Sequence, residues 1–156
     1  MKIRDVDIGE GQSLLTEDFD EVLYRQMTEH VFDVDKRVPA SHAFGPSTAD
    51  HGMPSYSRST LISAQDARNW HTSSAKSPSF GVFGVSTGEV IEAGTVALDD
   101  SESPDQSGDV KAPAHCFVDY RGLAKPDIKL VRAVLLRHAL SRREIPTVHQ
   151  DEVTLI

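Results

Sequence analysis

Apolar residues recur along the chain at spacings that predict three helices. Between residues 17 and 30, apolar side chains at helical spacing follow a cluster of acids, and acids stabilise a helix N-terminus. This pattern predicts a first helix over that range. A second, short helix is expected from Ser63, which has an acid three residues later as in a capping box, to about His71. The longest apolar stripe lies on a third predicted helix, which begins at Lys125-Pro126 and ends near Arg142.

Four other segments have the character of strands. They cover residues 38–44, where Pro39 places the strand at an edge, and residues 55–61, 80–85 and 114–120. The glycines of residues 80–85 indicate either that another element packs closely against that strand or that the strand contains a bulge. We therefore expect an α+β fold, in which about three helices pack on one face of a mostly antiparallel sheet.

The segments around these elements set the expected organisation. Residues 1–12 are polar and predict an N-terminal arm, residues 13–143 form the single domain, and residues 144–156 are a tail or a closing strand. Residues 99–112 are rich in Ser, Asp, Pro and Gly, which predicts an exposed acidic loop. The chain has no apolar run of membrane-spanning length and no apolar leader, so we expect a cytoplasmic protein that does not contact a membrane.

Charge is distributed unevenly around the formal net charge of −8. Residues 1–35 sum to −7, residues 99–109 to −5 and residues 121–143 to +6. Because segregated charge steers encounters between molecules, the leading hypothesis is a non-enzymatic accessory or protein-interaction module. Its basic helix would dock an acidic partner, such as the acidic loop of the same or a second molecule; a solvated helix face is the alternative. The candidate interaction residues are Lys129, Arg132 and Arg143.

The overall acidity disfavours a nucleic-acid binder, because phosphate binding needs a surplus of Lys and Arg. The basic helix nevertheless keeps nucleic acid open as a partner. Seven histidines include no ligand pair of recognised metal-site spacing, and one cysteine forms no internal disulfide. We therefore expect neither a metal site nor a cofactor.

A second hypothesis starts from residues 37–58, the richest polar stretch of the chain. Arginines, histidines and hydroxyls are interleaved there with Gly and Pro, as in a binding loop on a rigid base, and a structural loop is the alternative. Two arginines can hold a phosphate or a carboxylate, which suggests a small enzyme or binding domain for an anionic, nucleotide-like molecule. The candidate ligand-binding residues are Arg37, His42, Ser55, Arg58, His115 and Asp119. No residue is assigned a catalytic role.

Alternation along the strand at 114–120 restricts the chemistry of its side chains. Neighbours on a strand point to opposite faces, so Cys116 is expected in the core, away from His115. His115 and Asp119 share a face but lie about 13 Å apart along the strand, too far for a direct hydrogen bond. His115 is therefore expected either to line a cleft or to be satisfied by a backbone partner.

Several of these segments also carry a resemblance to a known family. Arg37-Val38, Phe44-x-Pro46, Asp50, Gly52 and Ser55 resemble a family of small uncharacterised bacterial proteins. The similarity continues through residues 81–85 and 113–119 into the basic helix, and it covers about residues 24–142. The resemblance implies that residues 37–58 and 115–119 are shared signatures, and it implies no reaction.

Overall fold

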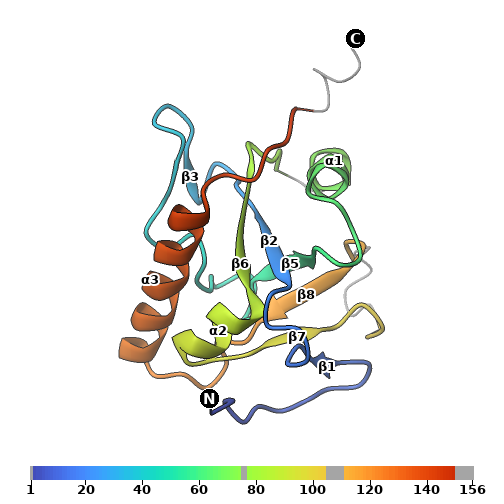
Figure 1. Cartoon of the computed structure of the whole chain (residues 1–156), viewed down its shortest axis with the longest axis vertical. Coiled ribbons are helices and arrows are strands. Elements are labelled where there is room, and N and C mark those ends of the chain that lie inside the picture. The colour runs from blue at the N-terminus through green and yellow to red at the C-terminus, as the bar shows by residue number, and fades with distance from the viewer. Residues whose placement is uncertain (1, 75–76, 105–110, 150–156) are drawn as a thin grey trace.

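The computed structural model of the chain describes residues 2–74, 77–104 and 111–149. Over these residues, six strands form an antiparallel sheet in the order β1-β7-β8-β5-β2-β6, and two more form a small hairpin (Figure 1). The sheet consists of β1 (Ser13–Leu14), β2 (Val22–Gln26), β5 (Ser55–Arg58), β6 (Val82–Ser86), β7 (Ala97–Asp99) and β8 (His115–Val118). The hairpin pairs β3 (Phe32–Asp33) with β4 (Val38–Pro39), and the helices are α1 (Ala64–Ser74), α2 (Thr87–Ala93) and α3 (Lys125–Arg142). The predicted α+β fold is confirmed.

The main core lies on the face of the sheet that α2 and α3 cover. Leu23, Val85 and Tyr56 project from neighbouring strands into this core, where they meet Val131 and Leu135 of α3. We call this side of the sheet the core face. Figure 1 shows α1 and α3 on opposite sides of β2 and β6, so the helices cover both faces of the sheet rather than one.

The helix predicted over residues 17–30 is wrong, because the chain forms the central strand β2 there. β2 pairs with β5 on one side and β6 on the other, and Leu23 is completely buried. The acids that suggested a helix N-terminus make a turn instead, in which Asp18 accepts hydrogen bonds from the backbone N–H groups of Asp20 and Glu21. Pairing on both sides thus overrides a local helical pattern.

Other predicted elements are present with adjusted ends. β5, β6 and β8 occupy the predicted strands, and α1 begins after Ser63, whose hydroxyl accepts the backbone N–H of Asp66 at 3.1 Å. The predicted strand at 38–44 is shortened to β4. A Cβ at Gly84 would lie 2.5 Å from Cγ1 of Val22, which confirms the expected close packing against β6.

The segments outside the main elements depart further from expectation. The predicted acidic loop begins within β7, since Asp99 is its last residue and is 6% exposed. Residues 105–110 of that loop and residues 150–156 lie outside the described residues. The expected closing strand is reduced to a single bridge between Ile145 and Val82. Within the part of the chain that is described, no helix is long and apolar enough to cross a bilayer.

Candidate active site

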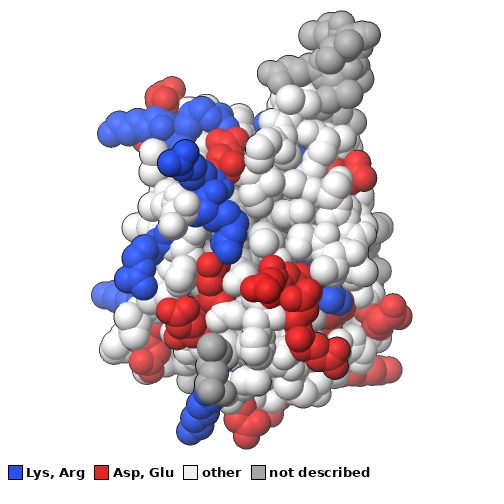
Figure 2. All heavy atoms as spheres, viewed as in Figure 1, with Lys and Arg blue, Asp and Glu red and all other residues white. Residues whose placement is uncertain are grey.

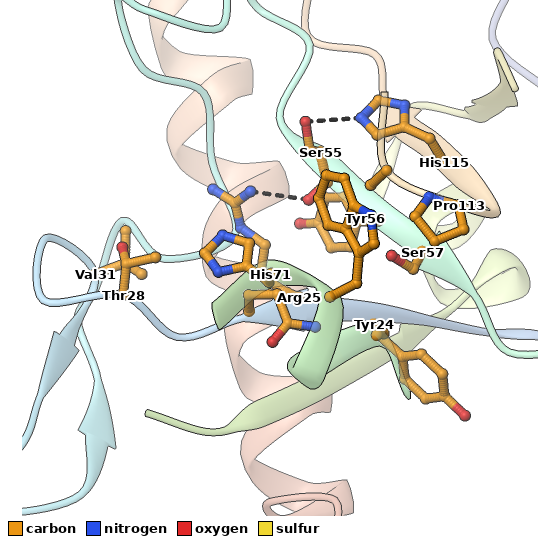
Figure 3. A pocket seen from close by; sticks show the side chains of 14 residues that line it. Tyr24, Arg25, Thr28, Val31, Ser55, Tyr56, Ser57, His71, Pro113 and His115 are labelled. Atoms are coloured by element: carbon orange, nitrogen blue, oxygen red, sulfur yellow. Dashed lines mark hydrogen bonds between the residues drawn. The ribbon is translucent and has the colours of Figure 1, made fainter. Parts of the chain in front are cut away.

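Ser55, His115 and Asp100 form a hydrogen-bonded chain on the face of the sheet opposite the core face (Figure 3). The Nε2 atom of His115 lies 2.9 Å from Oγ of Ser55, and its Nδ1 atom lies 2.5 Å from Oδ1 of Asp100. An ionised carboxylate only accepts hydrogen bonds, so Nδ1 of a neutral His115 carries the proton. Nε2 is then an acceptor for the Ser55 hydroxyl.

The register of three strands brings these side chains together. Ser57 of β5 and His115 of β8 are paired, and Ser55 lies two residues from Ser57 on the same face. On the other side of β8, Asp99 pairs with Cys116, which places Asp100 opposite His115. The side chains of His115 and Asp100 are each 15% exposed. A serine, a base and an orienting acid in hydrogen-bonding reach are the components of nucleophilic catalysis.

A pocket of about 120 Å³ opens beside Ser55 and His115. It lies between the sheet and α1, which contributes Ala67, Trp70 and His71 to its wall. The remaining apolar and aromatic wall comes from Tyr24, Val31, Ala112 and Pro113. Tyr56 also borders the pocket, while its ring lies in the core. We call this space the Ser55 pocket.

Arg25 borders the Ser55 pocket at the point where β2 and β5 stop pairing. The last paired residues of these strands are Tyr24 and Ser57, and the side chain of Arg25 occupies the space beyond them. Its Nε donates to the carbonyl of Ala43 at 3.0 Å and its Nη1 to the carbonyl of Ser55 at 2.9 Å. The guanidinium carbon also lies 5.3 Å from the centroid of the Tyr56 ring. These contacts fix a cation next to Ser55.

Burial keeps three further titratable side chains that line the pocket neutral near pH 7, namely His71, Tyr24 and Tyr56. Burial, and then the charge of Arg25, lowers the pKa of His71 below its ordinary value of 6.5. Burial also raises the pKa of Tyr24 and of Tyr56. Arg25 is the only Lys, Arg, Asp or Glu among the residues described as lining the pocket.

The structure brings together two of the six predicted ligand-binding residues, Ser55 and His115. Of the two alternatives left open for His115, the structure shows the cleft, because the residue lines the pocket and its ring contacts two side chains. Arg58 lies on the core face instead, where it pairs with Glu21 and Asp99. Strand alternation explains this separation, because Ser55 and Arg58 are three residues apart on β5 and so face opposite ways.

The other three predicted residues also lie outside the Ser55 pocket. Arg37 pairs with Glu144 at 2.9 Å, and His42 contacts a backbone carbonyl at 3.0 Å. Asp119 is buried and accepts hydrogen bonds from the side chain of Arg121. The structure therefore does not bring Arg37, Arg58 and His42 together with Ser55 and His115, because each of these three side chains is held in a separate contact.

Sequence reasoning missed Asp100 and Arg25, which complete the site. Asp100 lay in the segment that was predicted to be an exposed loop, and Arg25 lay in the predicted helix that does not form, so neither was considered as a site residue. The available signal for Asp100 was a pair of acids directly after the apolar run 96–98, since alternation sends one acid to each face. Cys116, by contrast, is fully buried as predicted, and burial raises the pKa of its thiol far above the ordinary value.

Of the candidate interaction residues, Lys129 and Arg132 lie on α3 and Arg143 directly follows it, and none of them lines the pocket. Lys129 and Arg143 are exposed, whereas the stem of Arg132 packs over Gly45, where an added Cβ would lie 2.9 Å from Cδ of Arg132. Figure 2 shows basic side chains along the side where Figure 1 places α3, and acidic ones over the lower part of the same view. Charge is thus segregated on this view of the surface, while the docking of a partner stays a prediction.

Comparison with known proteins does not assign this site to a known family. No protein-family model matches the chain, and no curated protein or solved structure is significantly similar to it. The resemblance to small bacterial proteins thus stays a hypothesis. Among the residues described, no group of three or more His, Cys, Asp or Glu side chains is arranged to hold a metal ion.

Proposed function

We propose that the chain is a small serine-dependent hydrolase that cleaves an ester or a similarly activated acyl compound. The observation that carries this proposal is the hydrogen-bonded order Ser55, His115, Asp100 at the mouth of a pocket. It favours the enzyme hypothesis over the non-enzymatic interaction module. The pocket also limits the size of the ligand. Pockets for drug-sized ligands have volumes of about 300–1,000 Å³, whereas the Ser55 pocket has a volume of about 120 Å³.

Each side chain has a defined role in the reaction. Oγ of Ser55 attacks the acyl carbon and forms a C–O bond, while its proton passes to Nε2 of His115. Asp100 holds the ring in the required tautomer and stabilises the imidazolium. The tetrahedral intermediate then expels the leaving group, which takes the proton from His115, and an acyl-Ser55 ester remains.

Water completes the cycle by the same proton route. His115 removes a proton from water as the water oxygen attacks the acyl-Ser55 ester, and it returns the proton to Oγ when the C–O bond breaks. The products are a carboxylic acid, which ionises near pH 7, and the free hydroxyl of Ser55. No step needs a metal ion or a redox partner.

Covalent labelling with a fluorophosphonate tests the proposal directly. The Ser55 oxygen would displace fluoride and form a P–O bond, and peptide mass spectrometry would locate the adduct. We expect a single adduct on Ser55 of the wild-type protein and none on Ser55→Ala. Hydrolysis of 4-nitrophenyl acetate should fall at least about 1,000-fold in that variant.

Ser57→Ala is the matched control for this experiment. Ser57 lies on the same strand and face and lines the same pocket, but the hydrogen bond of His115 Nε2 goes to Ser55 rather than to Ser57. The control should retain both labelling and hydrolysis. Absence of any adduct on Ser55 in the wild-type protein, or equal labelling of Ser55→Ala, would overturn the proposal.

A further inference from the structure

The Ser55 pocket contains a cation without a protein counter-ion. Arg25 donates two of the five guanidinium N–H bonds to backbone carbonyls. Over the described residues, no carboxylate lies within ion-pair distance of Arg25, whereas Arg58, Arg121 and Arg142 each pair with one. Three N–H donors of Arg25 therefore remain available to a ligand.

The pocket around this cation suits a small apolar body. Its volume of about 120 Å³ is close to that of an apolar cavity of about 150 Å³ that binds benzene. Trp70, Val31 and Pro113 supply aromatic and aliphatic surface, and neutral His71 adds no second charge. A ring-sized group fits this space, while a nucleotide exceeds it.

We infer that the Ser55 pocket binds a small carboxylate with a ring-sized apolar body, and that the guanidinium of Arg25 holds the carboxylate. A planar guanidinium matches the two oxygens of a carboxylate and can donate to both. The inference rests on the proposed function, because the bound carboxylate would be the acid that ester hydrolysis at Ser55 releases. The substrates are accordingly esters of small aromatic or branched aliphatic acids.

Benzoate and benzamide form a suitable pair of probes, because they have nearly the same shape and differ in charge. Their dissociation constants are measured by NMR titration with the wild-type protein and with Ser55→Ala. We expect benzoate to bind at least about 10-fold more tightly than benzamide to both proteins, since a charge-assisted hydrogen bond contributes more than a neutral one. Equal affinity for the two probes would overturn the inference.

Variants of Arg25 locate the source of this preference. In Arg25→Gln the preference for benzoate should disappear, whereas Arg25→Lys keeps the charge and should retain part of it. Arg132→Gln, at an arginine on α3 outside the pocket lining, is the matched control and should leave the preference unchanged. The ratio of the two affinities separates anion binding from support of the fold, because a structural defect weakens both probes.

The two proposals fail separately in these experiments. Fluorophosphonate labelling of Ser55 without any preference for benzoate retains the hydrolase and overturns the carboxylate pocket. A preference that depends on Arg25 without labelling of Ser55 retains the carboxylate pocket as a binding site and overturns the hydrolase. A preference that survives Arg25→Gln overturns the role of Arg25.

Discussion

The polar groups on the two sides of β5 differ in whether their charges are paired within the protein. On the core face, Arg58 donates through Nε and Nη2 to Glu21 and through Nη1 to Asp99. Thr60 donates a further hydrogen bond to Glu21. We call this set the Arg58 network. On the opposite face, Ser55 meets His115 and Asp100. Arg25, which borders the Ser55 pocket where β2 and β5 separate, has no carboxylate partner among the residues that the structure describes.

This contrast separates a structural cluster from a functional one. The side chains of Glu21 and Asp99 are 3% and 9% exposed, and burial alone raises the pKa of such carboxyls. Hydrogen bonds from Arg58 and neighbouring hydroxyls outweigh burial, so the pKa of each lies below its ordinary value. A buried network whose charges pair with one another leaves nothing for a ligand, whereas the Ser55 pocket retains free donors.

The adjacent acids Asp99 and Asp100 provide the sharpest test of the contrast. In Asp100→Asn the ring of His115 loses the carboxylate that orients it, so hydrolysis should fall roughly 10³- to 10⁴-fold with little change in stability. In Asp99→Asn the Arg58 network loses a charge, so the free energy of unfolding should fall by about 1–3 kcal/mol. Ester hydrolysis and urea denaturation of both variants measure the two effects.

The two variants should thus differ in which property they lose. If Asp99→Asn lost hydrolysis while remaining folded, the separation of the two faces would be wrong. A loss of stability in Asp100→Asn equal to that in Asp99→Asn would contradict it as well.

Removal of Arg58 should have the next largest effect, and it should act on stability. Arg58→Met leaves two buried carboxylates without their cation, and breaking a buried ion pair costs about 3–5 kcal/mol. Urea denaturation at pH 7 measures this loss. Arg142→Met is the control, because Arg142 pairs with Glu89 at a more exposed position and its removal should cost less. Equal losses in the two variants would contradict a special role of the Arg58 network.

The core face was more predictable from the sequence than the site was. Apolar runs indicate β6 and β8, and alternation alone puts Cys116 in the core. The pair Ser55 and His115 was identified as candidates, but their contact depends on the pairing of β5 with β8. Such pairing joins residues far apart in the chain, and no local pattern encodes it.

The remaining errors have the same origin. The acids before β2 are compatible with a helix N-terminus or with a turn, and only the pairing of β2 on both sides decides between them. Arg25 was missed because it lay within the helix predicted over residues 17–30. Arg37 and Arg58 were grouped because they flank one loop. Strand alternation sends Arg58 to the core face, whereas Arg37 lies in the turn between β3 and β4 and pairs with Glu144.

Acid titration should reveal the Arg58 network through its effect on stability, and this is the smallest effect we predict. The ordinary pKa values are 4.5 for Glu21 and 3.8 for Asp99, and both are lowered in the folded protein. Between about pH 5 and the lower folded values, the unfolded chain therefore binds more protons, so stability is complete above this window and falls as the pH falls through it. The free energy of unfolding of the wild-type protein should decrease on acidification from pH 6 to pH 3.

Other carboxyls, such as Glu89, titrate in the same range, so the comparison with Arg58→Met isolates the network. Without Arg58, Glu21 and Asp99 lose the hydrogen bonds and the charge of the guanidinium, so the pKa of each rises and their contribution to the pH dependence shrinks. The stability difference between the wild type and Arg58→Met should then shrink steadily as the pH falls from 6 to 3. A difference that stays constant across this range would mean that Arg58 stabilises the fold by packing alone, and the Arg58 network would lose its electrostatic basis.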